Sequence, residues 1–73
     1  MRVTEENVED LFAYHKPEAD QLEAFEKVRE AGVNLVKVIL EYVPECADRS
    51  VAIRKVREVR MDANQAIALR GAI

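Results

Sequence analysis

The chain has 73 residues, enough for one small domain whose hydrophobic core is marginal without outside support. It contains two Gly, two Pro and no Trp, and its abundant Ala, Val, Leu, Glu, Lys and Arg residues are typical of helices. It lacks the run of about eighteen apolar residues that a membrane span requires and an apolar segment like that of a signal peptide, so we expect a cytoplasmic protein.

The net charge of −3 conceals an unequal distribution along the chain. Residues 1–48 carry five Lys and Arg against twelve Asp and Glu, whereas residues 49–73 carry six against two. Opposed halves attract each other along a hairpin or between neighbouring subunits. A concentrated basic segment is equally suited to an anion such as a phosphate group. The charges therefore predict either internal pairing or an anion-binding surface.

The N-terminal segment, residues 1–17, is expected to form a short helix followed by a loop. Thr4 can cap a helix whose acidic first turn suits the positive end of the helix dipole, and which runs to about Phe12. Pro17 disfavours a helical conformation at the residue before it and suits the first position of the next helix.

The second segment, residues 18–43, repeats its apolar residues in alternating steps of three and four, as one face of a long helix does. Gly32 lies within this repeat at a cost of about 1 kcal/mol relative to Ala, so we interpret it as a point of close approach between helices. Pro44 ends the pattern, and the short link that follows favours an antiparallel return. The repeat consists of Phe25, Val28, Gly32, Leu35, Ile39 and Tyr42, flanked by Leu22, Val36, Leu40 and Val43.

The third segment, residues 47–70, has a narrower apolar stripe made mostly of small residues. Two such helices bury too little area, at about 25 cal/mol per Å², to offset the entropy of ordering the chain. The sequence therefore predicts an all-α fold, a short N-terminal helix plus a long antiparallel helical hairpin, completed by oligomerisation. The stripe consists of Ala52, Val56, Val59, Ala63, Ala66 and Arg70.

Catalytic chemistry has little material in this chain. It holds one His and one Cys, and neither a glycine-rich phosphate loop nor a His, Cys and carboxylate set with metal-ligand spacing. Cys46 and His15 are residue types that can form a nucleophilic pair, but no other feature of the sequence supports such a pair. Glu58 and Asp62 are two carboxylates four residues apart on one face, but Arg54 is also four residues from Glu58, a spacing typical of a surface ion pair. We therefore expect a protein that is not an enzyme and that uses no metal or cofactor.

Binding has better candidates in the expected loop after the short helix. Aromatic rings offer stacking faces for nucleobases, and cationic side chains contact phosphates. Lys27 and Arg29, early in the second segment, are expected to lie beneath this loop. In the alternative interpretation, the aromatic rings only pack the short helix onto the hairpin. The loop candidates are Phe12, Tyr14, His15 and Lys16.

A basic run in the third segment is the second candidate site. Arg57 and Arg60 are three residues apart and share a helix face, with Asn64 one turn further on. A symmetric oligomer would gather copies of these residues around its axis, where they would attract an anion. Pairing with the acidic second segment is the alternative, and duplex nucleic acid is not expected because the chain is acidic overall. The run contains Arg49, Arg54, Lys55, Arg57 and Arg60.

The order of these motifs resembles a family of small phage proteins, the hairpin-domain family shared by anti-CBASS cyclic-nucleotide sponges and Thoeris anti-defence sponges. The similarity covers roughly residues 12–70, and its most specific parts are Tyr14-His15-Lys16-Pro17 and Ala63-Asn64-Gln65-Ala66-Ile67-Ala68. The chain departs from the family pattern in two places. Arg57-Glu58 stands where an acidic pair is common, and Asp62 stands where a Trp is common.

The resemblance implies a hairpin assembled into dimers and then hexamers in an infected bacterial host. It implies sequestration, without cleavage, of cyclic oligonucleotides or cyclic ADP-ribose-type signals. Cyclic dinucleotides would lie between subunits against an N-terminal aromatic and a basic residue of the next helix, roles that match Tyr14 with Lys27 or Arg29. Cyclic trinucleotides would lie on a threefold axis, for which Arg57 and Arg60 are the candidates. The alternative is a structural or protein-binding helical oligomer.

Overall fold

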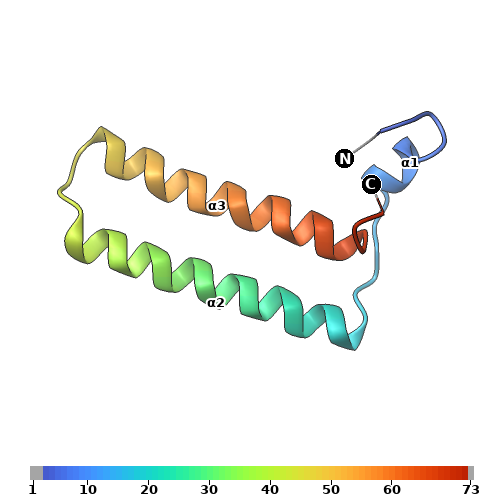
Figure 1. Cartoon of the computed structure of the whole chain (residues 1–73), viewed down its shortest axis with the longest axis horizontal. Coiled ribbons are helices and arrows are strands. Elements are labelled where there is room, and N and C mark those ends of the chain that lie inside the picture. The colour runs from blue at the N-terminus through green and yellow to red at the C-terminus, as the bar shows by residue number, and fades with distance from the viewer. Residues whose placement is uncertain (1–2, 73) are drawn as a thin grey trace.

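A computed structural model describes residues 3–72, which form three helices and no strand. They are α1 (Val8–Phe12), α2 (Ala19–Tyr42) and α3 (Ala47–Ala68). The two long helices run antiparallel side by side and are joined by the short link 43–46 (Figure 1). The all-α hairpin with a short N-terminal helix, predicted from the sequence, is confirmed.

Helix α1 begins later than the sequence predicted. The carbonyl of Thr4 accepts hydrogen bonds from the N–H groups of Asn7 (3.2 Å) and Val8 (3.0 Å), so residues 4–7 form a turn. Asn7 is the N-cap, and its Oδ1 accepts a hydrogen bond from the Thr4 N–H at 2.8 Å. A short polar side chain that binds nearby backbone in this way competes with helix formation, and the helix therefore begins at Val8 rather than after Thr4.

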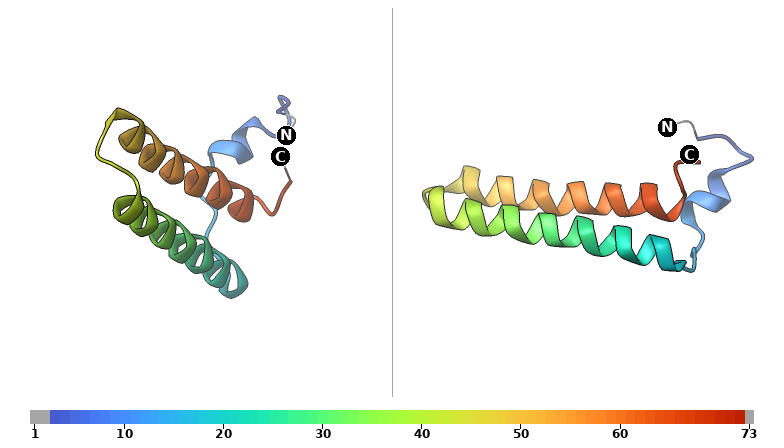
Figure 2. Two further views of the ribbon diagram at one scale, coloured as in Figure 1. Left: turned by 60° about the vertical axis from the view of Figure 1, so that its left-hand side comes forward. Right: turned by 60° about the horizontal axis from the view of Figure 1, so that its bottom comes forward.

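Helix α1 lies beyond the open end of the hairpin and covers neither of its broad faces (Figure 2). Among residues 3–72, the packing of helix on helix is that of α2 on α3. A hydrogen bond of 3.1 Å from Gln65 Nε2 to the Leu11 carbonyl connects α1 to the hairpin. The N-terminal segment therefore adds a terminal cover and no third layer.

Helix α2 begins with a capping box formed by Glu18 and Gln21. Glu18 is the N-cap, and its N–H donates to Gln21 Oε1 at 2.9 Å. The sequence had suggested that Pro17 occupies the first position of this helix. Pro17 instead precedes the N-cap. The reason is local, because the reciprocal pairing of Glu18 with Gln21 satisfies the free N–H groups that define the helix start.

Gly32 faces α3, as expected from its place in the apolar repeat. A Cβ at this position would lie 3.8 Å from Val56 Cγ1, an ordinary van der Waals distance. The two helices thus leave room for a methyl group at their crossing. Gly32 therefore lies against α3, as expected of a point of approach between the helices, although an alanine would also fit there in the single chain.

The hairpin has no enclosed core. Among residues 3–72 only Gln21 and Leu69 are buried, at 7% and 9% exposure. Leu35 and Val59, both predicted to lie in the apolar stripes, are 50% and 66% exposed. Two helices touch along one line, so the outer members of a broad stripe remain uncovered. The radius of gyration of 15.2 Å exceeds the roughly 11 Å expected of a compact chain of this length.

Candidate functional site

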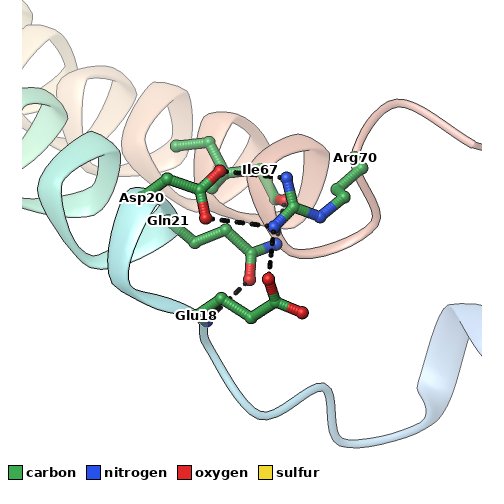
Figure 3. A network of polar contacts seen from close by, with 5 residues as sticks. All are labelled: Glu18, Asp20, Gln21, Ile67 and Arg70. Atoms are coloured by element: carbon green, nitrogen blue, oxygen red, sulfur yellow. Dashed lines mark hydrogen bonds and ion pairs between the residues drawn. The ribbon is translucent and has the colours of Figure 1, made fainter.

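A polar network closes the open end of the hairpin, and we call it the open-end clamp (Figure 3). Gln21 Nε2 donates to the Ile67 carbonyl at 2.9 Å, which joins the start of α2 to the end of α3. The two terminal nitrogens of Arg70 donate to the carboxylate oxygens of Asp20, each at 3.1 Å. One of these nitrogens also donates to Glu18 Oε2 at 3.2 Å. These contacts join the two helix ends beside Leu69, which is buried at 9% exposure.

Arg70 reaches the clamp because α3 ends before it. The N–H of Gly71 donates to the Ala66 carbonyl at 3.0 Å, and the N–H of Arg70 donates to the Ile67 carbonyl at 3.1 Å. This pattern is a Schellman motif, in which Arg70 takes the left-handed position with φ 50°. That conformation costs a non-glycine residue about 1–2 kcal/mol. Arg70 had been assigned to the apolar stripe of the third segment, and this assignment is wrong because the helix ends at Ala68.

The clamp should be sensitive to acid. The hydrogen bonds from Arg70, followed by its charge, lower the pKa of Asp20, and the carboxylate raises the pKa of Arg70 in turn. A lowered folded-state pKa stabilises the fold above the ordinary Asp value of 3.8, and this stabilisation is lost as the pH falls through the lowered value. Asp20→Asn should therefore lower the melting temperature at neutral pH and leave it nearly equal to that of the wild type at the acid end. Melting curves measured from pH 7 downward test this.

Glu23→Gln is the matched control, since Glu23 is an exposed acidic residue of α2 that makes no ion pair within residues 3–72. If the melting temperatures of Asp20→Asn and the wild type stay equally far apart at every pH, the clamp does not act through the ionisation of Asp20.

An open depression of about 560 Å³ lies beside the clamp, and we call it the mouth. Tyr14, His15 and Lys16 line it together with Arg70 and Leu69. His15 Nε2 donates to the Asp10 carbonyl at 2.7 Å, so this ring nitrogen carries a proton. The Tyr14 side chain is 86% exposed, which leaves its ring available for stacking.

Phe12 does not line the mouth, and it is 83% exposed. Neither its ring nor that of Tyr14 therefore packs the short helix onto the hairpin within the single chain. The alternative interpretation of these two aromatic residues as internal packing is not what the structure shows.

Three arginines from two helices line one groove, which we call the arginine groove. Arg29 of α2 and Arg57 and Arg60 of α3 surround a depression of about 160 Å³. Its apolar floor contains Val36 and Val56. A neighbouring depression of about 140 Å³ continues along α3, where the groove residues Arg57 and Arg60 meet Met61 and Asn64.

The groove carries little compensating negative charge. Arg29 is paired with Glu26 at 3.2 Å, whereas Arg57 and Arg60 make no ion pair within residues 3–72. Asn64 Oδ1 is buried without a hydrogen-bond partner. Three neighbouring guanidinium groups repel one another in an open groove, so an anion bound between them would be stabilised.

Within residues 3–72, the charges of the two halves pair at the open end of the hairpin, through Arg70, and not along the length of the two long helices. In the part of the chain that the structure describes, the ion pairs are Arg29 with Glu26, and Arg70 with Glu18 and Asp20. The internal pairing of the α3 basic run with the acidic α2, offered as the alternative, is therefore absent from the single chain. The positive charge of α3 stays available for a ligand or a second chain.

The structure groups the candidate residues differently from their order in the sequence. Tyr14 and His15 meet at the mouth, whereas Arg29 lies with Arg57 and Arg60 in the arginine groove. Lys27 is exposed on α2 and lines neither place. A contact between Tyr14 and Lys27 or Arg29 would therefore have to form between chains.

Sequence reasoning missed the clamp. Its charged members, Glu18, Asp20 and Arg70, lie at the two ends that an antiparallel hairpin brings together. The available signals were the Glu18-x-x-Gln21 spacing of a capping box and the opposite charges at these two ends.

Over residues 3–72, no three His, Cys, Asp or Glu side chains are grouped closely enough to hold a metal ion. In the same range, no helix combines the length and apolar character needed to cross a membrane. The exposed Tyr14 ring at the mouth can stack on a flat ligand, and the cations of the arginine groove can bind an anion.

Comparison with known proteins identifies the family. Residues 4–68 match the family described as "Acb2/Tad1, hairpin domain", which covers nearly the whole chain. No curated protein and no solved structure matches the chain. The matched segment includes α1, both long helices, the arginine groove and the Tyr14 and His15 side of the mouth, whereas Leu69 and Arg70 follow it. The chain therefore belongs to the Acb2/Tad1 hairpin-domain family, the family of anti-CBASS and Thoeris anti-defence sponges.

Proposed function

We propose that this protein is a non-enzymatic phage anti-defence sponge that sequesters cyclic oligonucleotide immune signals between subunits of a homo-oligomer. The ligands are cyclic di- or trinucleotides, with cyclic ADP-ribose isomers as a further class. The family match over residues 4–68 carries the proposal. The assembly that the family resemblance implies is built from dimers and reaches a hexamer in the cytoplasm of the infected host.

The exposure of the hairpin supports the homo-oligomer. Large apolar side chains on both long helices are half or more exposed, among them Leu35 and Val59. Exposed apolar surface of this extent is unfavourable in water and is typical of association surfaces. Additional chains would cover it and complete the core that the single hairpin lacks.

The side chains available for binding support a nucleotide ligand. Tyr14 is 86% exposed, and we propose that its ring stacks on a base, with His15 beside it in the mouth. In this proposal Lys27 is contributed by a neighbouring chain, and the exposed Phe12, outside the mouth, meets the ligand across the same boundary between chains. We propose that Arg57 and Arg60, joined by Arg29, contact phosphates of the larger ligand through charge-assisted hydrogen bonds. Because Arg29 shares their groove, we place it with them and leave Lys27 as the partner of Tyr14.

Thermal denaturation with a panel of ligands tests the proposal. A ligand that binds only the folded protein at 100 times its dissociation constant stabilises it by about 2.7 kcal/mol, so the melting temperature should rise clearly. The panel contains cyclic dinucleotides, cyclic trinucleotides and cyclic ADP-ribose isomers, with linear dinucleotides as the control. The ligand recovered after heat denaturation should be intact, which separates a sponge from a hydrolase.

A melting temperature that does not rise with any of the cyclic ligands would contradict the sponge proposal. A stable oligomer that ignores all of them would instead favour a structural or protein-binding role. In that case the exposed aromatic residues would serve as packing surfaces between chains.

A further inference from the structure

One buried polar group on α3 has no partner in the single chain. Asn64 Oδ1 is closed off from solvent and accepts no hydrogen bond within residues 3–72. Buried carbonyl oxygens in folded proteins are nearly always paired, because an unpaired one destabilises the fold. A leucine of nearly the same shape would avoid this penalty. Asn64 is therefore unfavourable for the stability of the single hairpin, which is typical of a residue that serves binding.

The surroundings of Asn64 connect it to the arginine groove. The depression that continues this groove along α3 is lined by Arg57, Arg60, Met61 and Asn64. Arg60 is four residues before Asn64, so the two lie one turn apart on the same face of α3, whereas Arg57 is two turns away. Side chains of a helix lean toward its N-terminus, so the Asn64 amide is directed toward the turn that carries Arg60.

The Arg60 side chain is not held in one place by the single chain. It is exposed and makes no ion pair within residues 3–72. It lines the arginine groove and its continuation, and also a third depression of about 400 Å³ whose other walls include Val28, Leu35 and Val59. A long side chain with this freedom loses rotamer entropy when a ligand holds it in one direction. A neighbour that favours the binding direction reduces that loss.

We infer that Asn64 is a positioning residue, whose side-chain oxygen accepts a hydrogen bond from the Arg60 guanidinium when an anion occupies the arginine groove. The guanidinium carries five N–H donors in a planar fork, so one edge can donate to Asn64 while another donates to a phosphate oxygen. The charged donor also satisfies the buried oxygen. This inference rests on the proposed function and deepens it by naming the residue that orients Arg60.

Asn64 acts through Arg60 and does not contact the ligand itself. Its oxygen is closed to solvent, so a ligand in the groove cannot reach it unless a protein side chain moves. Arg60 already forms a wall of the same depression, and rotation about its own side-chain bonds brings its donors toward the amide.

Melting temperature and affinity should change in opposite senses in Asn64→Leu. The ligand-free full chain should melt at a higher temperature, because an unpaired buried oxygen has been removed. Binding of cyclic tri-AMP, measured by calorimetry, should weaken about tenfold, because Arg60 has lost its partner. A residue with a purely structural role would lower the melting temperature. A lower melting temperature together with weaker binding would therefore overturn the inference.

Asn34→Leu is the matched control. Asn34 is an exposed asparagine of α2 outside the arginine groove, and the substitution makes the same change in helix propensity. We expect Asn64→Leu to raise the melting temperature by about 5 °C more than this control does. The control should change the affinity for cyclic tri-AMP by less than about twofold.

A double-mutant cycle identifies the residue through which Asn64 acts. In an Arg60→Met background, Asn64→Leu should change the affinity by less than about twofold, because the donor is already gone. In an Arg57→Met background, the loss of about tenfold should persist. An equal loss in both backgrounds would mean that Asn64 does not act through Arg60, and the inference would be overturned.

Inorganic tripolyphosphate, as a second probe, separates this inference from the proposed function. It supplies phosphate groups without a base or a nucleotide ring. A wild type that binds tripolyphosphate but no cyclic nucleotide would contradict the sponge proposal, and the effect of Asn64→Leu on tripolyphosphate binding would then decide the inference. A wild type and an Asn64→Leu variant that bind cyclic tri-AMP equally well would overturn this inference alone. If the wild type binds neither anion, Arg60 has no anion to meet and both proposals fail.

Discussion

The double variant Arg57→Gln and Arg60→Gln is expected to lose cyclic trinucleotide binding by on the order of 100-fold or more. Each arginine would contribute a charge-assisted hydrogen bond worth about 1.5–3 kcal/mol, and each 1.4 kcal/mol is a factor of ten in affinity. Both side chains line the arginine groove, and neither has an ion-pair partner within residues 3–72 that would hold it away from a ligand. Isothermal titration calorimetry of the oligomer measures the affinity directly.

Two comparisons make this result specific to the groove. Arg54→Gln removes the same charge from α3 outside the arginine groove and should change the affinity less than about threefold, as loss of a screened surface charge does. Tyr14→Ala should instead weaken cyclic dinucleotides, since stacking on an aromatic ring is worth about 1–3 kcal/mol per base. If the arginine variant and Tyr14→Ala weaken both ligand classes equally, the two proposed sites are one.

The sequence predicts the hairpin well because its strongest signals are periodic and local. The alternating apolar steps around Phe25 and Val28 and the break at Pro44 are properties of single helices, which need no knowledge of their neighbours. The helix ends were less predictable. The Asn7 side chain accepts a hydrogen bond from the Thr4 N–H in the turn before α1, and Arg70 leaves α3 for a carboxylate on the other helix. Such choices depend on individual hydrogen bonds that a repeat does not encode.

To predict which candidate binding residues lie together, one must know how the turns of α2 align with those of α3. Arg29 was associated with Tyr14 because it was expected to lie beneath the loop and because the family resemblance pairs an N-terminal aromatic with a basic residue of the next helix, yet it lies with Arg57 and Arg60. Which turn of α2 faces which turn of α3 depends on the length of the link and on the contacts that join the open end. The apolar stripes likewise do not tell which of their residues the hairpin itself covers. Leu35 and Val59 belong to the repeats, but both are exposed in one chain.

Gln21→Leu is expected to lower the melting temperature by about 10 °C. Gln21 is 7% exposed and uses both ends of its amide, accepting from the Glu18 N–H and donating to the Ile67 carbonyl. Leucine fills a similar volume but leaves both backbone groups without this partner, at a combined cost of about 2 kcal/mol. A domain of this size loses about 4–8 °C per kcal/mol. Circular dichroism at a fixed protein concentration measures the shift, because the stability of an oligomer depends on concentration.

Gln65→Leu separates the clamp from a general effect of removing a glutamine. Gln65 is exposed, and its side chain donates to the Leu11 carbonyl at 3.1 Å, so the loss of this contact should shift the melting temperature by less than about 2 °C. An unchanged melting temperature in Gln21→Leu would mean that the clamp does not hold the hairpin ends together.

The clamp also fixes Glu18, where the loop that carries Tyr14 enters α2. Gln21→Leu should therefore weaken dinucleotide binding at temperatures where the protein is still folded, whereas trinucleotide binding in the distant arginine groove should persist.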